Sequence, residues 1–448
     1  MPRRTSIRRR SVTSAATAVT ALAALTMVAP PAHAVTLVPC DPAALVQAVA
    51  SANTSAEPDT LSLSPNCVYT LTERADATNN SGLPGIDGTL TINGNDATVG
   101  RAGDAPRFRL IANWGELVLN DVTLTGGHAP DGVGTDTFGD GRSGQSGGAI
   151  QNWGPLTINN SVITGNTSGA GAPGVDATAT TRAGRGGGGG FGGGIASYSL
   201  STVKLTITDT LITGNATGPG GVGGDGTGTR PGGTGGSGGF GGGIDVTDGA
   251  SLRITNSTVT GNVTGNGAAG GSGGPDGGGG GDGGGGGVGA GMFVSADQDA
   301  PLYPFVIATT ISGNQAGNGG DAGAAGPNGY AGWSGSGGGG GGIAVLYDIL
   351  TVSGGTIVDN AAGAPGAGMY PHPGSGGGIY TLSAQVALTD GAVVSGNLPD
   401  NCDYLEDVPG CVNDGAAGVS GGPPAVRHRH LVDLAVAERN AAMATSRR

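Results

Sequence analysis

The sequence predicts an all-β protein: a three-faced parallel solenoid with an N-terminal capping helix and glycine-rich loops that leave from one corner. The main observation is a short unit, LTINNSVITGN, which spans residues 156–166 and recurs along the chain. Clear copies are LTITDTLITGN (205–215), LRITNSTVTGN (252–262) and LTVSGGTIVDN (350–360), with looser copies at 117–127, 304–314 and 386–397. Repeats with a period of roughly 20–50 residues are typical of stacked arrays.

Each unit has the apolar pattern of two short strands joined by a bend. Leu156, Ile158 and Ile163 alternate with polar residues, and most copies keep apolar residues at these positions. Alternation with a period of two is the pattern of a β-strand. A third strand, marked by glycines and one apolar residue, precedes each unit, as in Gly147-Gly148-Ala149-Ile150. Three strands make one turn, and stacked turns pair in parallel about 4.8 Å apart.

These repeats resemble two known groups of proteins. The three-strand turn resembles the right-handed, single-stranded parallel β-helix of the pectate-lyase-like superfamily. The Gly-Gly-Ala-Ile segment and the unit-ending Asn resemble the repeats of the polymorphic membrane protein family over residues 110–400. The segment from Cys40 to Leu71 looks like the leader of many secreted actinobacterial β-helix proteins, and the scarcity of Lys beside Arg fits a GC-rich genome. The resemblance implies a secreted protein that works at a surface.

An Asn ends nearly every unit. These residues are Asn166, Asn215, Asn262, Asn314, Asn360 and Asn397. Asn tolerates the left-handed turn conformation, and stacked Asn amides can hydrogen-bond along a column. We expect a structural Asn ladder at a turn, with ligand binding as the less favoured alternative.

The first 34 residues have the features of a secretory signal, so we expect a secreted protein. Five arginines precede an apolar stretch, and Ala32-His33-Ala34 is a small-x-small cleavage site. Removing the signal takes the formal charge from -13 to -18. A chain this acidic is unsuited to nucleic acid, which requires a basic face. We expect no membrane insertion and a monomer.

The remaining chain divides into four predicted parts. Residues 35–85 form an N-terminal cap, with a helix at 43–52 that Asp41 caps and strands at 60–63 and 68–71. The β-helix follows at 86–400, a C-terminal cap at 401–414, and a linker with a weakly helical basic tail at 415–448. The spacing of the four cysteines does not fix their pairing. We expect Cys40–Cys67 and Cys402–Cys411 disulfides, one in each cap.

Glycine-rich inserts lie between each unit and the next glycine-marked strand. They cover residues 128–146, 167–191, 216–240, 263–288, 315–339 and 361–375. Because so much glycine leaves no side chains for a core, we favour mobile loops. The alternative is a set of extended polyglycine segments that hydrogen-bond to one another while the turns hold them in register.

Few residues in the sequence suggest chemistry. Trp114 and Trp153 precede their units by the same offset, so they should stack on adjacent turns. An exposed indole pair suits the face of a sugar ring, and the plainer alternative is that the indoles only cover a turn.

The glycine-rich segment 220–225 ends in Asp225 like the start of a Ca²⁺-binding repeat, but Thr227 stands where an apolar residue is required. We therefore expect no cofactor, and Ca²⁺ only as an adventitious ligand. The acids Asp121 and Asp209 share one register without a second carboxylate partner, and the histidines are scattered.

The sequence favours a secreted, non-catalytic, adhesin-like β-helix that contacts a polysaccharide or a cell-surface component. A polysaccharide lyase or glycoside hydrolase of the pectate-lyase-like fold is the first alternative. Such enzymes need paired carboxylates or catalytic basic residues on one face, and the repeats show no such set. A purely structural glycine-rich matrix protein is the second alternative.

Overall fold

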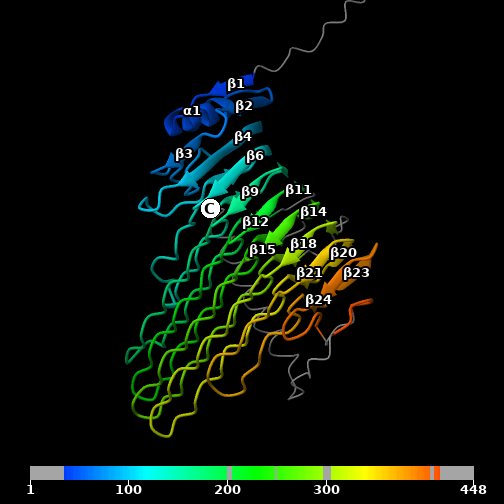
Figure 1. Cartoon of the computed structure of the whole chain (residues 1–448). Helices are drawn as coiled ribbons and strands as arrows, with labels where there is room; N and C mark the ends of the chain where they lie inside the picture. The colour runs from blue at the N-terminus through cyan, green and yellow to red at the C-terminus, as the bar shows by residue number, and fades with distance from the viewer. Residues whose placement is uncertain (1–34, 199–203, 248–249, 296–303, 404–407, 414–448) are drawn as a thin grey trace, which may run out of the picture. The chain divides into compact units, whose positions relative to one another are not determined.

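The computed structural model describes residues 35–198, 204–247, 250–295, 304–403 and 408–413. These residues form a parallel β-helix, with strands paired in register from turn to turn (Figure 1). The predicted signal peptide (1–34) and the predicted tail (415–448) lie outside the described residues. Within the described part of the chain, no helix is long and apolar enough to cross a membrane.

Each turn of the β-helix contributes one strand to each of three faces. The first face is a seven-stranded sheet: β5 (Ile111–Asn113), β7 (Ile150–Asn152), β10 (Ile195–Tyr198), β13 (Ile244–Thr247), β16 (Met292–Ser295), β19 (Ile343–Leu346) and β22 (Ile379–Leu382). The second face contains β8 (Leu156–Asn159), β11 (Lys204–Thr208), β14 (Ser251–Thr255), β17 (Phe305–Ile307), β20 (Ile349–Ser353) and β23 (Gln385–Thr389). The third contains β9 (Val162–Thr164), β12 (Leu211–Thr213), β15 (Thr258–Thr260), β18 (Thr310–Ser312), β21 (Thr356–Val358) and β24 (Val393–Ser395). The long strands β4 (Thr89–Arg101) and β6 (Glu116–Thr125) run through both the second and third faces. The strand β6 pairs with β8 and with β9, and β4 pairs with β6 in both faces.

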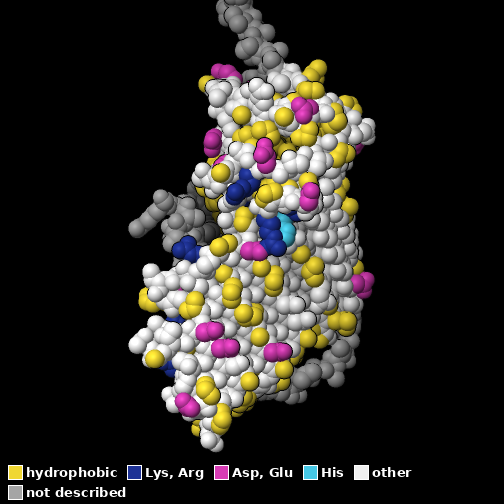
Figure 2. All heavy atoms as spheres, turned by 90° about the vertical axis from the view of Figure 1, so that its left-hand side faces the viewer, with side chains coloured by type: hydrophobic (Ala, Val, Ile, Leu, Met, Phe, Trp, Pro, Cys, Tyr) yellow, Lys and Arg dark blue, Asp and Glu magenta, His cyan; other side chains and the backbone are white. Residues whose placement is uncertain are grey.

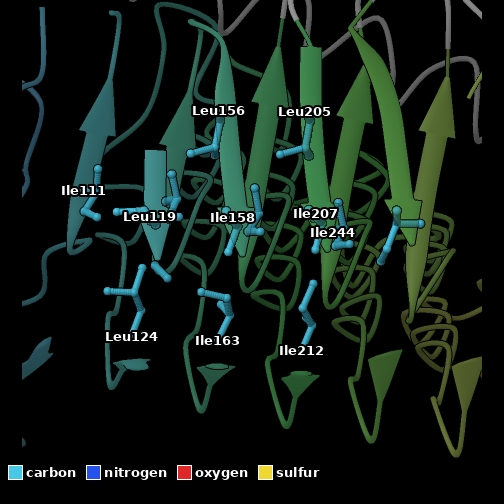
Figure 3. Packing of buried hydrophobic residues seen from close by; sticks show 14 of the residues in the cluster. Ile111, Leu119, Leu124, Leu156, Ile158, Ile163, Leu205, Ile207, Ile212 and Ile244 are labelled. Carbon is cyan, nitrogen blue, oxygen red and sulfur yellow. The ribbon is translucent and has the colours of Figure 1, made fainter. Parts of the chain in front are cut away.

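The core consists of apolar columns that follow the repeat. Leu156 pairs with Leu205, and Leu205 pairs with Leu252, so identical positions stack from turn to turn. The side chains of Leu156, Leu205 and Ile212 are fully buried. Figure 3 shows these columns pointing into the interior from all three faces. The predicted apolar positions of the unit are therefore the core positions.

Left-handed residues make the bend between the second and third faces. Asp121, Asn160, Asp209 and Asn256 occupy this position with φ between 45° and 50°, and Asp390 does so with φ 50°. Asn and Asp tolerate this conformation better than other residues with side chains. The shared register of Asp121 and Asp209 thus follows from backbone geometry.

The N-terminal cap covers the first turn of the β-helix. The helix α1 (Pro42–Ala52) begins after Asp41, whose carboxylate accepts the Ala43 N–H at 3.2 Å, as the sequence predicts. Two predicted strands are confirmed as β2 (Asp59–Leu63) and β3 (Val68–Leu71). The structure adds β1 (Val35–Val38), which pairs with β2 and was not predicted. Leu45 and Val49 of α1 are fully buried against the end of the core.

Both expected disulfides are present. Cys40 pairs with Cys67 across a separation of 27 residues, and Cys402 pairs with Cys411 across 9 residues. A disulfide restricts the unfolded chain more when it closes a longer loop. Each bond therefore secures one end of the β-helix, and the N-terminal bond closes the longer loop.

Replacing Cys40 and Cys67 by Ser is expected to lower the free energy of unfolding by about 3–4 kcal/mol. The matched variant, Cys402→Ser with Cys411→Ser, should lose about 1 kcal/mol less, because its loop is shorter. Denaturant unfolding of both variants beside the wild type measures the difference. A larger loss for the C-terminal pair would contradict this prediction.

Candidate functional site

The glycine-rich inserts form an ordered sandwich of two layers. Each insert runs out from the β-helix in one arm and returns in a second arm. The outward arms cover 129–134, 169–177, 217–226, 264–274, 316–326 and 362–368, and the return arms cover 139–147, 184–192, 231–241, 278–289, 330–340 and 369–376. Figure 1 shows the arms as long traces that run side by side away from the strands.

Backbone hydrogen bonds join the arms within each layer. In the outward layer, the Gly220 N–H donates to Asn266 O at 3.0 Å, and three residues later Gly223 donates to Ala269 O at 3.0 Å. In the return layer, the Gly189 N–H donates to Ser237 O at 2.9 Å. Each arm therefore donates to the next arm of its own layer once every three residues.

A second set of hydrogen bonds joins the two layers with the same period. The Gly236 N–H donates to Gly221 O at 2.8 Å, and the Gly221 N–H donates to Gly187 O at 2.8 Å. A period of three residues is that of the polyproline II helix, which has no hydrogen bonds of its own. The neighbouring arms supply hydrogen bonds here at two of every three positions, so the arms are held together without α-helix or β-strand.

This order corrects the expectation of mobile loops. The polyglycine alternative describes the structure, because the arms are hydrogen-bonded to one another over most of their length. The physical reason is the tethering by the β-helix. Stacked turns hold the bases of successive arms in register, so an arm pays little extra entropy to pair with its neighbour.

Along each outward arm, the side chain of every third residue points to the outer face of the layer. Asp225 and Asp321 lie on this face, and each carboxylate accepts a backbone N–H of the next arm, from Ser272 and Ala367 respectively, both at 2.7 Å. Asn318 accepts the Ala364 N–H at 2.8 Å in the same way. Each of these three side chains satisfies one N–H group of the next arm that points out of the layer. Asp225, the one acid of the Ca²⁺-like segment, therefore has a structural role in this face.

The two tryptophans meet at the corner between the first and second faces. Trp114 and Trp153 lie parallel, with ring centroids 3.8 Å apart and an interplanar angle of 4°, as their shared offset predicts. Tyr198 continues the column, with its ring centroid 6.2 Å from that of Trp153. Trp114 is 46% exposed. The aromatic column therefore has one open end, at Trp114.

Buried amides fix the backbone beneath this corner. The Asn113 Nδ2 donates to Asn152 Oδ1 at 2.7 Å, and the Asn152 Nδ2 donates to Ser197 Oγ at 3.0 Å. The residue after each Asn is a tryptophan, and the Trp153 N–H donates to Asn113 O at 2.8 Å. Because Asn113 and Asn152 are fully buried, the indoles project from a rigid support.

The Asn ladder forms inside another corner, where the unit meets the glycine arms. From Asn215 to Asn397, each Asn Oδ1 accepts both the N–H and the Nδ2 of the Asn one turn before; Asn262 accepts both from Asn215 at 3.0 Å. The Oδ1 of Asn166, the first member, accepts the Gly127 N–H at 2.9 Å. All six predicted residues take part: Asn166, Asn215, Asn262, Asn314, Asn360 and Asn397. Asn401 extends the ladder and was missed, because it lies outside the repeat. The left-handed turn belongs to the preceding residue, usually Gly such as Gly165 with φ 63°, so the expected reason for these Asn residues was wrong in part.

A separate apolar cluster lies where the return arms meet the outer side of the seven-stranded sheet. Phe191 and Phe240 lie in one column, with ring centroids 5.1 Å apart, and Phe293 continues it at 5.1 Å from Phe240. Val288 and Tyr380 belong to the same cluster. This cluster anchors the bases of the return arms.

The charged side chains near the first arm form a small group that Figure 2 shows beside a largely white, glycine-rich face. Arg107 forms an ion pair with Asp131. Burial, with Arg107 and Arg101 nearby, lowers the pKa of His128 to about 4. His128 is therefore neutral near pH 7. Among the described residues, no group of three or more His, Cys, Asp or Glu side chains is placed to hold a metal ion.

Comparison with known proteins adds no further assignment. Neither protein-family models, nor curated proteins, nor solved structures give a match to this chain.

Proposed function

We propose that this protein is a secreted, non-catalytic β-helix that binds polysaccharide at an extracellular surface, with Trp114 as the principal contact. The observation that carries the proposal is the stacked indole pair whose outer member, Trp114, is 46% exposed. The pair presents a flat apolar ring on a rigid backbone, which is the chemistry that recognises the C–H face of a pyranose.

Three features of the chain support this proposal. The Trp114 ring already stacks on Trp153, so little side-chain freedom is lost when a ligand binds. The glycine sandwich adds a large hydrogen-bonded surface of short side chains, which suits contact with an extended or flat partner. Two disulfides are compatible with an extracellular protein.

Replacing Trp114 by Ala is expected to weaken binding to the recognised polysaccharide about tenfold or more, because the stacking contact is lost. Trp114→Tyr should keep part of the affinity, since an aromatic face remains. The measurement is binding of the purified chain to a panel of neutral and acidic polysaccharides, followed by titration of the best ligand.

Tyr330→Ala is the matched control, because Tyr330 is 86% exposed and belongs to a return arm. This variant should bind like the wild type. Equal affinities for Trp114→Ala and the wild type would remove the basis of the proposal. Release of unsaturated or reducing sugar ends from the same panel would instead favour the lyase or hydrolase alternative.

A further inference from the structure

The glycine sandwich is built from arms added one after another, so each layer ends at the last insert. Every arm before the last donates backbone N–H groups to its successor. An edge of unpaired N–H groups is a template for pairing with another chain. The residues at the C-terminal edge therefore decide whether a second molecule can add there.

In the outward layer, one column of donors ends in proline. The column consists of Gly132, Gly171, Gly220, Gly267 and Gly319, each of which donates its N–H to the next arm at 2.8–3.0 Å. Gln315 pairs with Ala361, so the residue of the last arm in register with Gly319 is Pro365. Proline has no backbone N–H, so this edge position offers no donor.

The return layer repeats the same arrangement independently. Its column consists of Gly144, Gly189, Gly238, Gly286 and Gly337, each of which donates to the next arm at 2.8–2.9 Å. Trp333 pairs with Met369, so the residue in register with Gly337 is Pro373. In both layers, a column of five glycines ends in a proline. The two prolines lie on different arms, so the conformation of a single turn does not account for both.

Closer to the β-helix, the C-terminal segment covers the same edge. The Ala362 N–H donates to Leu398 O at 2.8 Å, and the Gly376 N–H donates to Asp400 Oδ1 at 2.6 Å. Protein acceptors thus cover the donors at the base of the arms, and each proline removes the next donor along its arm.

The N-terminal edge of the sandwich presents backbone carbonyl groups, which can accept hydrogen bonds from N–H donors of the kind found at the C-terminal edge. The first arms accept no bonds from an earlier glycine arm, and the buried Arg109 covers part of this edge by donating to Ser146 O at 3.1 Å. A contact between the two edges would be head-to-tail, and head-to-tail contacts that do not close produce open chains of molecules.

We propose that Pro365 and Pro373 terminate the glycine sandwich and prevent a second copy of this chain from adding to its C-terminal edge. The two positions act together, one in each layer. The partner that they exclude is the N-terminal edge of another molecule, with its outward-facing carbonyls near Asp131 and Ser143.

The test is the double variant Pro365→Ala with Pro373→Ala, which restores an N–H at both positions and keeps a Cβ. It should show concentration-dependent self-association by light scattering and sedimentation, under conditions where the wild type keeps its mass.

The matched control is Pro219→Ala with Pro371→Ala. Pro219 lies on the outer face of its arm, and Pro371 is in register with Gly335, which donates between layers to Gly320, so neither adds an edge donor.

The control variant should keep the mass of the wild type. Self-association of both double variants alike, or of the wild type itself in the same manner, would overturn the proposal. So would an unchanged mass of the Pro365 and Pro373 variant with a wild-type circular dichroism spectrum. If that variant misfolds, the Gly versions at the same two positions provide the same comparison, since glycine occupies these columns in every earlier arm.

Discussion

Replacing Gly189 by Ala is expected to lower the free energy of unfolding by about 3 kcal/mol or more. A Cβ at Gly189 would lie 1.9 Å from Gly218 O and 2.7 Å from Gly239 N. Both atoms belong to backbone that is itself hydrogen-bonded in the sandwich, so no side-chain rotation relieves the overlap. The arms must separate, and the hydrogen bonds of Gly189 and Gly239 weaken with them.

The neighbouring Gly188 provides the control. A Cβ there would meet nothing closer than Ser143 Oγ at 3.7 Å, which is ordinary contact. Gly188→Ala should be neutral or stabilise the fold by up to about 1 kcal/mol, because Ala restricts the unfolded chain. Denaturant unfolding measures both variants, and hydrogen exchange should show lost protection in the arms of Gly189→Ala only. Equal stabilities for the two variants would show that the arms are not packed as described.

The β-helix was predictable from the sequence because its signal lies in side chains. Leu156, Ile158 and Ile163 repeat with strand periodicity, and burial of those same positions forms the core. The indole pair was predictable for a related reason, since a constant offset within a repeat places Trp114 beside Trp153. The side-chain pattern of the repeat does not predict whether the glycine-rich inserts, which have few side chains, are structurally ordered.

The sequence of the inserts nevertheless contains a pattern that corresponds to the sandwich. In GGVGGD (220–225) and GGTGGSGG (232–239), two glycines alternate with one other residue. The two glycine positions are those where a Cβ would strike a neighbouring arm, and the third position faces outward. A three-residue period of this kind predicts polyproline II arms only when something holds them in register, because such a helix has no bonds of its own. That requirement is met by the β-helix and is a property of the tertiary structure.

Replacing Asn262 by Ala is expected to destabilise the protein by about 3–5 kcal/mol. The side chain is fully buried, and its Nδ2 donates to Ile212 O at 3.0 Å and Asn314 Oδ1 at 3.0 Å. Its Oδ1 accepts both the N–H and the Nδ2 of Asn215. Truncation therefore leaves a buried N–H of Asn215 and a buried carbonyl of Ile212 without these partners, and it opens a cavity in the corner.

Two further variants separate these causes. Asn262→Asp keeps the shape of the side chain and avoids a cavity, but it removes the Nδ2 donor and places a carboxylate in the core. We expect the free energy of unfolding near neutral pH to fall at least as much as for Asn262→Ala.

Asn159→Ala is the control, because Asn159 belongs to a half-exposed ladder on the second face, where its Nδ2 donates to Asn120 Oδ1 at 2.9 Å. Water replaces that bond, so its loss should cost about 0.5 kcal/mol. Thermal and denaturant unfolding rank the three variants. Similar losses for Asn262→Ala and Asn159→Ala would mean that the buried column contributes no more than the surface one. The predicted order requires that the corner below the glycine arms is dry, so that each amide of the column depends on its neighbour one turn away.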